Sequence, residues 1–277
     1  MWPEDILAEA IGKRLAERGS PRPLVVGLCG AQGSGKSTIS AALVARFERA
    51  VTFSLDDLYL GRAARLDLAR RIHPLLATRG VPGTHDPMLG VEVLGALKRG
   101  QCVALPRFDK AQDDRVPCDS WPIVEPGCEL MIFEGWCVGA RPQAAKDLVE
   151  PINRLEAEED PDGRWRRFVN EALGGPYQQL FGCIDMLALL AAPNWETVLR
   201  WRIEQEHELR AASPEGTGVM DDDTIARFVS HFERLTRHIL VEMPSRADLV
   251  LHLNESRDCV GIDTHAASET ASLRGAS

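Results

Sequence analysis

The sequence predicts an α/β protein of three layers, in which helices cover both faces of a parallel β-sheet. Short apolar runs have the length of buried strands, and segments with apolar residues at helical spacing separate them. Such alternation is typical of parallel sheets, because each parallel connection needs a crossover. The expected strands cover residues 24–29, 51–55, 129–133, 184–191 and 248–253.

The helices expected between these strands follow from apolar residues three and four positions apart. Ile6, Leu7, Ile11 and Leu15 form one stripe of a helix over residues 4–18, ahead of a core that begins at about residue 24. Other helical segments are expected over 39–47, 88–99, 193–212 and 224–240, the last one with Asp223 as its cap, and a broken helical stretch over 143–175.

The irregular parts of the chain divide into an excursion, a loop and a tail. The Pro-containing residues 101–128 are expected to form a small hairpin or excursion at the sheet edge, and residues 212–223 a loop. No break in composition divides residues 1–257, so we expect a single domain. The Ser- and Ala-rich residues 258–277 are expected to be a poorly ordered tail.

Composition restricts the possible partners. The chain has 277 residues and a net charge of −9, which argues against a general surface for nucleic acid or anionic membrane. No apolar run approaches the roughly 18–20 residues that span a bilayer, and the amphipathic N-terminus has no signal-peptide core. Seven scattered cysteines without a C-x-x-C pair are typical of a reduced cytoplasmic protein. The oligomeric state does not follow from the sequence.

The stretch GAQGSGKST fits the phosphate-loop (Walker A) pattern G-x-x-x-x-G-K-[ST]. It follows an apolar strand and precedes a helical segment, which is the context that this loop needs. Glycines let backbone N–H groups turn toward a phosphate, Lys36 supplies a charge for the β- and γ-phosphates, and Ser37 offers a hydroxyl to Mg²⁺. The predicted nucleotide-binding residues are Gly30, Gly33, Ser34, Gly35, Lys36, Ser37 and Thr38.

Carboxylates follow two of the expected strands, and open α/β sheets bind ligands beyond the carboxyl ends of strands. Asp56 and Asp57 follow strand 51–55. Adjacent side chains point to opposite sides, so at most one of the two is expected to face the phosphates. The alternative for each residue is that its side chain caps a helix. Glu134 directly follows strand 129–133 and is expected to serve a metal, the alternative being a carboxylate merely solvated at a strand end.

Basic residues recur at two further places. Arg200, Arg202 and Arg210 lie on the helix after Pro193, where an exposed salt-bridged face is the alternative to a functional role. Arg107, Asp109, Lys110 and Arg115 cluster around PRFDKAQDDR. His85 and Asp86 lie in a Gly/Pro-rich turn, and a lone histidine is more often structural than catalytic.

Taken in order from about residue 24 to residue 257, six segments resemble the P-loop small-molecule kinases that include phosphoribulokinase, uridine kinase and pantothenate kinase. The closest resemblance is to the D-glycerate 3-kinase type and its bacterial relatives. The phosphate loop is common to many NTPases, whereas RGVPGTHD with PRFDK and FEGW is more specific. The segments are GAQGSGKST, FSLDDLYL, RGVPGTHD, LPRFDK, IFEGW and WRIEQEHELR.

The resemblance implies a P-loop NTPase fold with a five-stranded parallel core, ATP and Mg²⁺, and a lid helix that carries Arg202. Asp56 would be the general base, and Glu134 would serve the metal site together with Ser37. Asn254 and Arg257 would lie near the adenine. The residues implied for the acceptor are Asp57, Tyr59, His85, Asp86, Arg107 and Lys110.

The expected function is therefore an ATP-dependent kinase that phosphorylates a hydroxyl of a small polar, anionic acceptor such as D-glycerate. The alternatives are a kinase for a nucleoside, a pantothenate-like acid or a sugar, and an ATPase or nucleotide switch without an acceptor. The sequence departs from the pattern of the resembled family in two places: Leu58 stands where a Phe is usual, and AQDDR is shorter than the usual Gly-rich stretch. Both places could touch the acceptor pocket, so both departures concern the identity of the acceptor.

Overall fold

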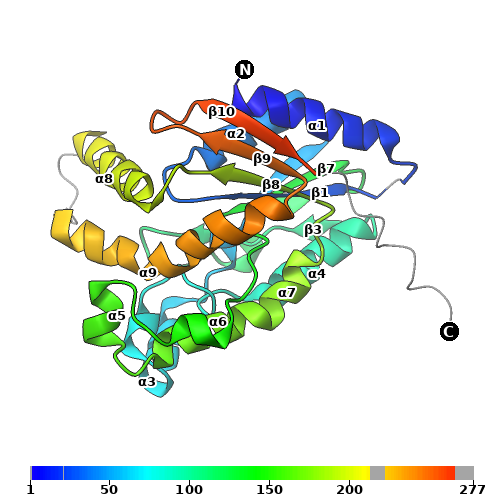
Figure 1. Ribbon diagram of the computed structural model, residues 1–277. Coiled ribbons are helices and arrows are strands. Elements are labelled where there is room, and N and C mark those ends of the chain that lie inside the picture. The colour runs from blue at the N-terminus through cyan, green and yellow to red at the C-terminus, as the bar shows by residue number, and fades with distance from the viewer. Residues whose placement is uncertain (1, 21, 213–221, 266–277) are drawn as a thin grey trace, which may run out of the picture.

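The computed structural model describes residues 2–20, 22–212 and 222–265, with all their side chains except those of residues 208–212 and 222–223. Its centre is a six-stranded sheet of order β10-β9-β8-β1-β7-β2 (Figure 1). All neighbours from β9 to β2 pair in parallel, which confirms the predicted five-stranded parallel core. The strands are β1 (Leu24–Gly30), β2 (Ala50–Ser54), β7 (Leu130–Gly135), β8 (Met186–Ala191), β9 (Leu249–Leu253) and β10 (Cys259–Thr264).

Strand β10 corrects the expectation of a poorly ordered tail over 258–277. It pairs antiparallel with β9, with Thr264 opposite Leu249 and Cys259 opposite Leu253. Without it, β9 would present a row of unpaired N–H and C=O groups at the sheet edge, so pairing explains why this segment is ordered. Residues 266–277 and the predicted cap by Asp223 lie outside what the structure describes.

Helices cover both faces of the sheet, as the sequence predicts (Figure 1). Side chains alternate along β1, so Val26 and Leu28 face one core cluster, whereas Val25 and Cys29 face the other. The first face is covered by α1 (Pro3–Glu17), α2 (Lys36–Arg46) and α8 (Trp195–Ala212). The second is covered by α4 (Pro87–Lys98), α7 (Pro176–Phe181) and most of α9 (Asp222–Glu242).

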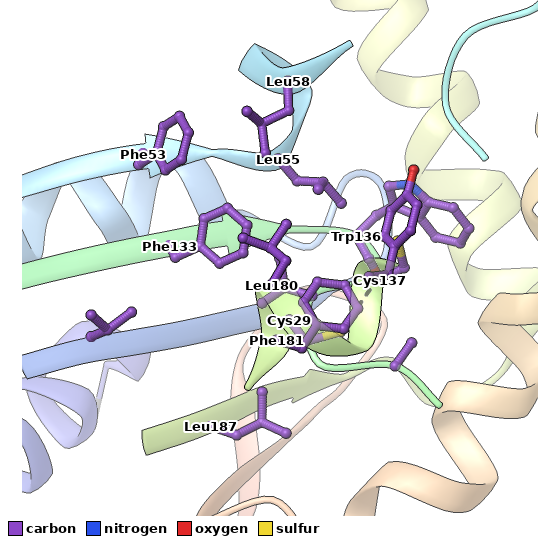
Figure 2. Close-up of a cluster of buried hydrophobic side chains, with 14 of the residues drawn as sticks. Cys29, Phe53, Leu55, Leu58, Phe133, Trp136, Cys137, Leu180, Phe181 and Leu187 are labelled. Carbon is purple, nitrogen blue, oxygen red and sulfur yellow. Dashed lines mark hydrogen bonds between the residues drawn. The ribbon is translucent and has the colours of Figure 1, made fainter. Parts of the chain in front are cut away.

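The second cluster extends to the carboxyl ends of the strands (Figure 2). The rings of Phe53 and Phe133 lie 5.5 Å apart between β2 and β7. Beyond them, Cys29 donates through Sγ to the Trp136 carbonyl over 3.4 Å, and Cys29 and Cys137 are fully buried. Close packing up to the last residue of these strands holds the loops that follow them in fixed positions.

The remaining elements connect the strands and helices already described. Two small two-stranded sheets, β3-β6 and β4-β5, confirm the predicted excursion over 101–128. Residues 143–175 form separate short helices, in agreement with the predicted broken helical stretch. These elements are η1 (Leu55–Leu58), α3 (Arg62–Arg71), η2 (Pro74–Ala77), β3 (Val103–Ala104), β4 (Phe108–Asp109), β5 (Asp114–Arg115), η3 (Cys118–Ser120), β6 (Ile123–Val124), η4 (Ala145–Leu148), α5 (Arg154–Glu159), α6 (Arg164–Gly174) and η5 (Met243–Ser245).

Candidate active site

A cavity of about 390 Å³ lies at the carboxyl ends of β1, β2 and β7. Parallel strands end at the same edge of a sheet, so segments far apart in the sequence meet here. The cavity is mixed in character, with charged groups from the strand ends and two aromatic rings from α9. Its lining residues are Gln32, Gly33, Gly35, Lys36, Ser37, Thr38, Ser54, Asp56, Tyr59, Arg79, Lys110, Glu134, Gly135, Trp136, Arg202, Gln205, Phe228 and Phe232.

The phosphate loop forms one wall. Gly35 is the N-cap of α2 with φ of 86°, and Gly33 has φ of 76°, a region that favours glycine. The Lys36 ammonium donates to the Ala31 carbonyl over 3.0 Å, and the N-terminus of α2 faces the cavity. Among the described residues, the buried Ser34 hydroxyl has no hydrogen-bond partner. The Lys36 ammonium and the backbone N–H groups at this helix end fit an anionic ligand.

Gly30 and Ser34 do not line the cavity, although the sequence places both among the nucleotide-binding residues. Gly30 ends β1 behind the loop, and a Cβ there would lie 2.7 Å from the Ser34 hydroxyl oxygen. The structure therefore brings these two residues together as part of the loop's packing. Gly33, Gly35, Lys36, Ser37 and Thr38 are the members that reach the cavity surface.

Asp56 points into the cavity. Its Oδ1 accepts from the Tyr59 hydroxyl over 2.8 Å, and its Oδ2 accepts from the Lys110 ammonium over 2.6 Å. Burial alone would raise the pKa of Asp56, but the charge of Lys110 and these two hydrogen bonds outweigh it, so the pKa lies below its ordinary value. The carboxylate is thus ionised and oriented at neutral pH.

Asp57 does not line the cavity, so only one of the two carboxylates reaches it, as expected; the reason differs from strand alternation, because both residues lie on the 3-10 helix η1 that follows β2. It accepts from the Arg107 guanidinium over 3.0 Å and from the Phe108 backbone N–H over 3.3 Å. Asp57 and Arg107 thus join the excursion at β4 to the end of β2. Neither lines the cavity, so the structure does not bring these two predicted acceptor residues to it.

Glu134 and Ser37 are the candidate metal-site residues, and both line the cavity. Burial raises the pKa of Glu134, although the charge of Lys36 and a hydrogen bond from Ser54 act in the opposite direction. No group of three or more His, Cys, Asp or Glu side chains in the described ranges could hold a metal alone. A hydroxyl and a carboxylate beside a phosphate loop fit Mg²⁺, which takes most of its ligands from water and phosphate oxygens.

Arg202 lies on α8, the expected lid helix, and its side chain lines the cavity. It pairs with Glu206, and its guanidinium carbon lies 5.9 Å from the centre of the Phe228 ring. The side chain is only 15% exposed, so Arg202 does not belong to a solvated helix face. The side chain of Arg210 lies outside the described residues.

Asn254 and Arg257 build the turn between β9 and β10. Asn254 Oδ1 accepts from the backbone N–H groups of Ser256 and Asp258, each over 2.9 Å. Arg257 donates through Nε to the Gly33 carbonyl over 2.7 Å. Both lie outside the cavity lining, and Arg257 supports the phosphate loop from behind. Their predicted proximity to adenine stays a prediction.

His85 and Asp86 lie behind the cavity wall, unlike the predicted acceptor residues Tyr59 and Lys110, which line it. His85 stacks on Tyr59 with 4.5 Å between ring centres, and its Nδ1 lies 2.6 Å from the Tyr177 hydroxyl. Burial lowers the pKa of His85 to about 3, so the imidazole is neutral. Asp86 caps α4 through the Leu89 N–H. Both residues support Tyr59 and its turn.

Sequence reasoning missed several residues of the cavity, among them Arg79 and the aromatic residues of α9. Arg79 begins RGVPGTHD, but no periodicity marks which residue of an irregular loop faces a site. Phe228 and Phe232 are four positions apart on a helix, which is the ordinary pattern of core residues. Leu58 is fully buried in the second cluster and does not line the cavity.

A mostly parallel sheet with a phosphate loop after its central strand defines the P-loop fold class. No family model matches the chain. The chain is 35% identical to an uncharacterized kinase of Schizosaccharomyces pombe, mug58, over 82% of this chain and 86% of the relative. It is 29% identical to the chloroplastic D-glycerate 3-kinase of Arabidopsis thaliana over 93% of this chain, which spans 58% of that relative.

Among solved structures, D-glycerate 3-kinase from Cryptococcus neoformans matches with a TM-score of 0.72 and 26% identity, covering 95% of this chain and 99% of that one. The chain belongs to the P-loop small-molecule kinases, the family that includes D-glycerate 3-kinase and uridine kinase. It is therefore an enzyme that uses a nucleotide as phosphoryl donor.

No helix within the described residues is long and apolar enough to cross a membrane. The cytoplasmic location stays a prediction, as does the expected absence of nucleic-acid and membrane partners.

Proposed function

We propose that this kinase transfers the γ-phosphoryl group of ATP to a hydroxyl of a small anionic hydroxy acid, with D-glycerate the favoured acceptor. The observation that carries the proposal is the ionised Asp56, which lines the same cavity as Lys36 of the phosphate loop. A kinase needs a carboxylate at the acceptor hydroxyl, whereas a nucleotide switch needs only a group that positions water. The D-glycerate 3-kinase names of two relatives support the choice of acceptor.

In the proposed reaction, Asp56 accepts the proton of the acceptor hydroxyl. The hydroxyl oxygen forms a bond to the γ-phosphorus, the bond from that phosphorus to the oxygen bridging to the β-phosphate breaks, and ADP leaves. The hydrogen bond from Tyr59 holds the Asp56 carboxylate in position for this proton transfer. Reaction by such a base contributes typically ~10²–10⁴-fold to the rate.

Lys36, Arg202 and the proposed metal site would bind the phosphates of ATP, the phosphoryl donor. Lys36 exchanges its contact with the Ala31 carbonyl for phosphate oxygens, and Arg202 neutralises charge on the transferred group. Ser37 and Glu134 would hold Mg²⁺, directly or through its water. When bound, this ion supplies neutralisation of the β- and γ-phosphate charges.

The test is ADP release from ATP and Mg²⁺ with a panel of acceptors: D-glycerate, L-glycerate, uridine, pantothenate, a hexose and no acceptor. We expect turnover that depends on D-glycerate and yields one phosphorylated acceptor for each ADP. Turnover without an acceptor would contradict phosphoryl transfer to an alcohol. Turnover that depends on uridine or the hexose, with none on either glycerate, would contradict the acceptor class.

A further inference from the structure

Three carboxylates lie close to the part of the cavity around Asp56, which we call its acceptor end, and each forms an ion pair with one cation. Asp56 pairs with Lys110 over 2.6 Å, Asp57 with Arg107 over 3.0 Å, and Asp86 with Arg115 over 3.3 Å. Each of these carboxylates therefore balances one cation. A positive charge that can bind an anionic acceptor must therefore come from another residue of the cavity wall.

Asp113 is the carboxylate that breaks this one-to-one pattern, because two guanidinium groups share it. Arg65 approaches its Oδ2 to 2.7 Å, and Arg79 binds its Oδ1. Burial alone would raise the pKa of Asp113, but the hydrogen bonds from both arginines hold the pKa below its ordinary value. Two positive charges thus face one negative charge.

Arg65 cannot be the arginine that offers the surplus charge to a ligand. It is 2% exposed, and its guanidinium donates to the carbonyls of Leu60, Ala77 and Asp113, each over 3.0 Å. These bonds and the Asp113 carboxylate use all three of its nitrogens. Arg65 therefore serves to hold Asp113, whose φ of 56° is unusual for a residue with a side chain.

Arg79 is free to serve a ligand. Its side chain is 29% exposed and lines the cavity, and of its five N–H donors only those on one terminal nitrogen are engaged, by Asp113, among the described residues. Its guanidinium carbon lies 5.6 Å from the centre of the Phe108 ring, which also contacts Tyr59, the partner of Asp56. The surplus charge thus lies close to the proposed base.

We propose that Arg79 binds the anionic group of the acceptor, a carboxylate in the case of a hydroxy acid, and that Asp113, clamped by Arg65, is the positioning residue that aims it. The inference rests on the proposed function for the reaction at Asp56. A guanidinium matches a carboxylate through two parallel N–H donors, so a held Arg79 selects for that group. The acceptor hydroxyl then lies at Asp56 while its carboxylate lies at Arg79.

The experiment compares D-glycerate with D-glyceramide, in which a neutral amide replaces the carboxylate, in the full chain with saturating ATP. Wild type should favour the acid. Arg79→Gln should raise KM for D-glycerate by about 10–100-fold, because a charge-assisted bond is lost, while KM for D-glyceramide changes within about threefold. Arg79→Lys should raise KM for D-glycerate less than Arg79→Gln does, since lysine restores the charge but not the planar pair of donors.

Asp113→Asn tests the positioning role. Asn also tolerates a left-handed backbone, so this variant removes the charge and leaves the turn possible. It should raise KM for D-glycerate by about 3–10-fold, with less effect on kcat and no effect on KM for D-glyceramide. Arg49→Gln is the matched control: Arg49 pairs with Glu129 over 3.2 Å at the amino end of β7, so this variant should behave as wild type.

The outcomes separate the two proposals. If wild type favours D-glycerate and Arg79→Gln keeps that preference, the role of Arg79 is wrong and the proposed function stands. If wild type shows no preference for the acid, both the anionic acceptor and the role of Arg79 are wrong. Equal increases in KM for acid and amide would indicate a general disturbance of the pocket and would also overturn the inference. A KM for ATP close to wild type identifies variants that are correctly folded.

Discussion

Lys110 donates to Oδ2 of Asp56 over 2.6 Å, although it lies fifty-four residues later in the chain. The contact lies at the carboxyl ends of the strands, where both residues line the cavity. The two residues lie on different structural units, since Asp56 follows β2 and Lys110 follows the short strand β4. The excursion over 101–128 therefore completes the electrostatic environment of the proposed base. This contact explains why a buried carboxylate remains ionised.

The first prediction concerns the pH dependence of Lys110→Gln. Burial tends to raise the pKa of Asp56, and the charge of Lys110 is the main cause that lowers it. Removing that charge raises the pKa of Asp56, so the base becomes protonated at higher pH. The acidic limb of the kcat/KM profile should therefore move to higher pH, and the loss of activity relative to wild type should grow as pH falls.

A matched control for this measurement is Lys98→Gln. Lys98 also pairs with an aspartate, Asp185, over 2.9 Å, but this pair lies at the opposite end of β1 from the cavity, where Asp185 accepts from the Val25 N–H. Its acidic limb should coincide with that of wild type. If the acidic limb of the kcat/KM profile of Lys110→Gln stays in place or moves to lower pH, Asp56 is not the group whose titration causes this limb.

Asp56→Asn and Asp57→Asn should separate catalysis from stability. Asp56→Asn keeps the shape but removes the proton acceptor, so kcat should fall by about 10²–10⁴-fold with ATP affinity largely retained. Asp57→Asn weakens the bonds to Arg107 and Phe108, so it should lower the free energy of unfolding by about 1 kcal/mol with a small effect on kcat. Steady-state kinetics and urea unfolding of both variants check this. Loss of kcat in Asp57→Asn alone would mean that the roles are reversed.

Gly33→Ala and Gly35→Ala should differ in stability although both residues have positive φ. A Cβ on Gly33 would lie 2.6 Å from Cβ of the fully buried Trp201, whereas nothing lies within 4 Å of a Cβ on Gly35. Gly35→Ala should lower the free energy of unfolding by about 1–2 kcal/mol, because alanine is strained in a left-handed backbone conformation. Gly33→Ala should lower it by clearly more, because the new Cβ also collides with Trp201. Urea unfolding without nucleotide measures both. Equal losses would show that the loop moves away from α8 without cost.

Lys36→Ala should reduce turnover by at least ~10²–10³-fold, because it removes a charge that neutralises the developing phosphate oxygens. Its effect on the melting temperature should be small, since within the described residues the ammonium donates a hydrogen bond only to the Ala31 carbonyl. A folded variant with nearly normal turnover would exclude this loop as the site of ATP.

Arg202→Ala should lower kcat/KM by about 10²-fold and affect ATP binding much less, as expected for a charge that acts mainly in the transition state. Arg200→Ala is the control on the same helix. Arg200 pairs with Glu255 on an exposed face, where solvent screens the two charges, and its variant should keep wild-type kcat/KM. If both variants are equally active, α8 does not act as the lid.

The sequence was sufficient for the parallel core, because β1, β7 and β8 contain long apolar runs and the more polar β2 and β9 still have short ones. It also predicted that at most one of Asp56 and Asp57 faces the cavity, but not which one, and not the reason: both lie on the 3-10 helix η1, where successive side chains also diverge. It failed for β10, whose alternation of Val260 and Ile262 is short and lies in a Ser- and Ala-rich context. That strand forms because β9 offers a free edge, which only the three-dimensional structure reveals.

The acceptor end of the cavity was the least predictable part. Arg107, His85 and Asp86 are charged or polar residues in a segment that resembles an acceptor pocket, yet Asp57, Tyr177 and α4 take up their hydrogen bonds. Arg79 lines the cavity and donates to Asp113, thirty-four residues later. Residue type indicates that a group can bind an anion, but the arrangement of partners determines which one is available.

The order of the strands has a consequence for synthesis of the chain. β1 is made early, yet its two neighbours are β7 and β8, which begin at Leu130 and Met186. A nascent chain that ends before residue 130 therefore carries the run from Leu24 to Leu28 with no partner strand, and long-range parallel pairing of this kind is slow. During translation this fully buried strand lacks one of its two partners until residue 191 has left the ribosome, so we expect the yield of the protein to depend on chaperones that bind early segments.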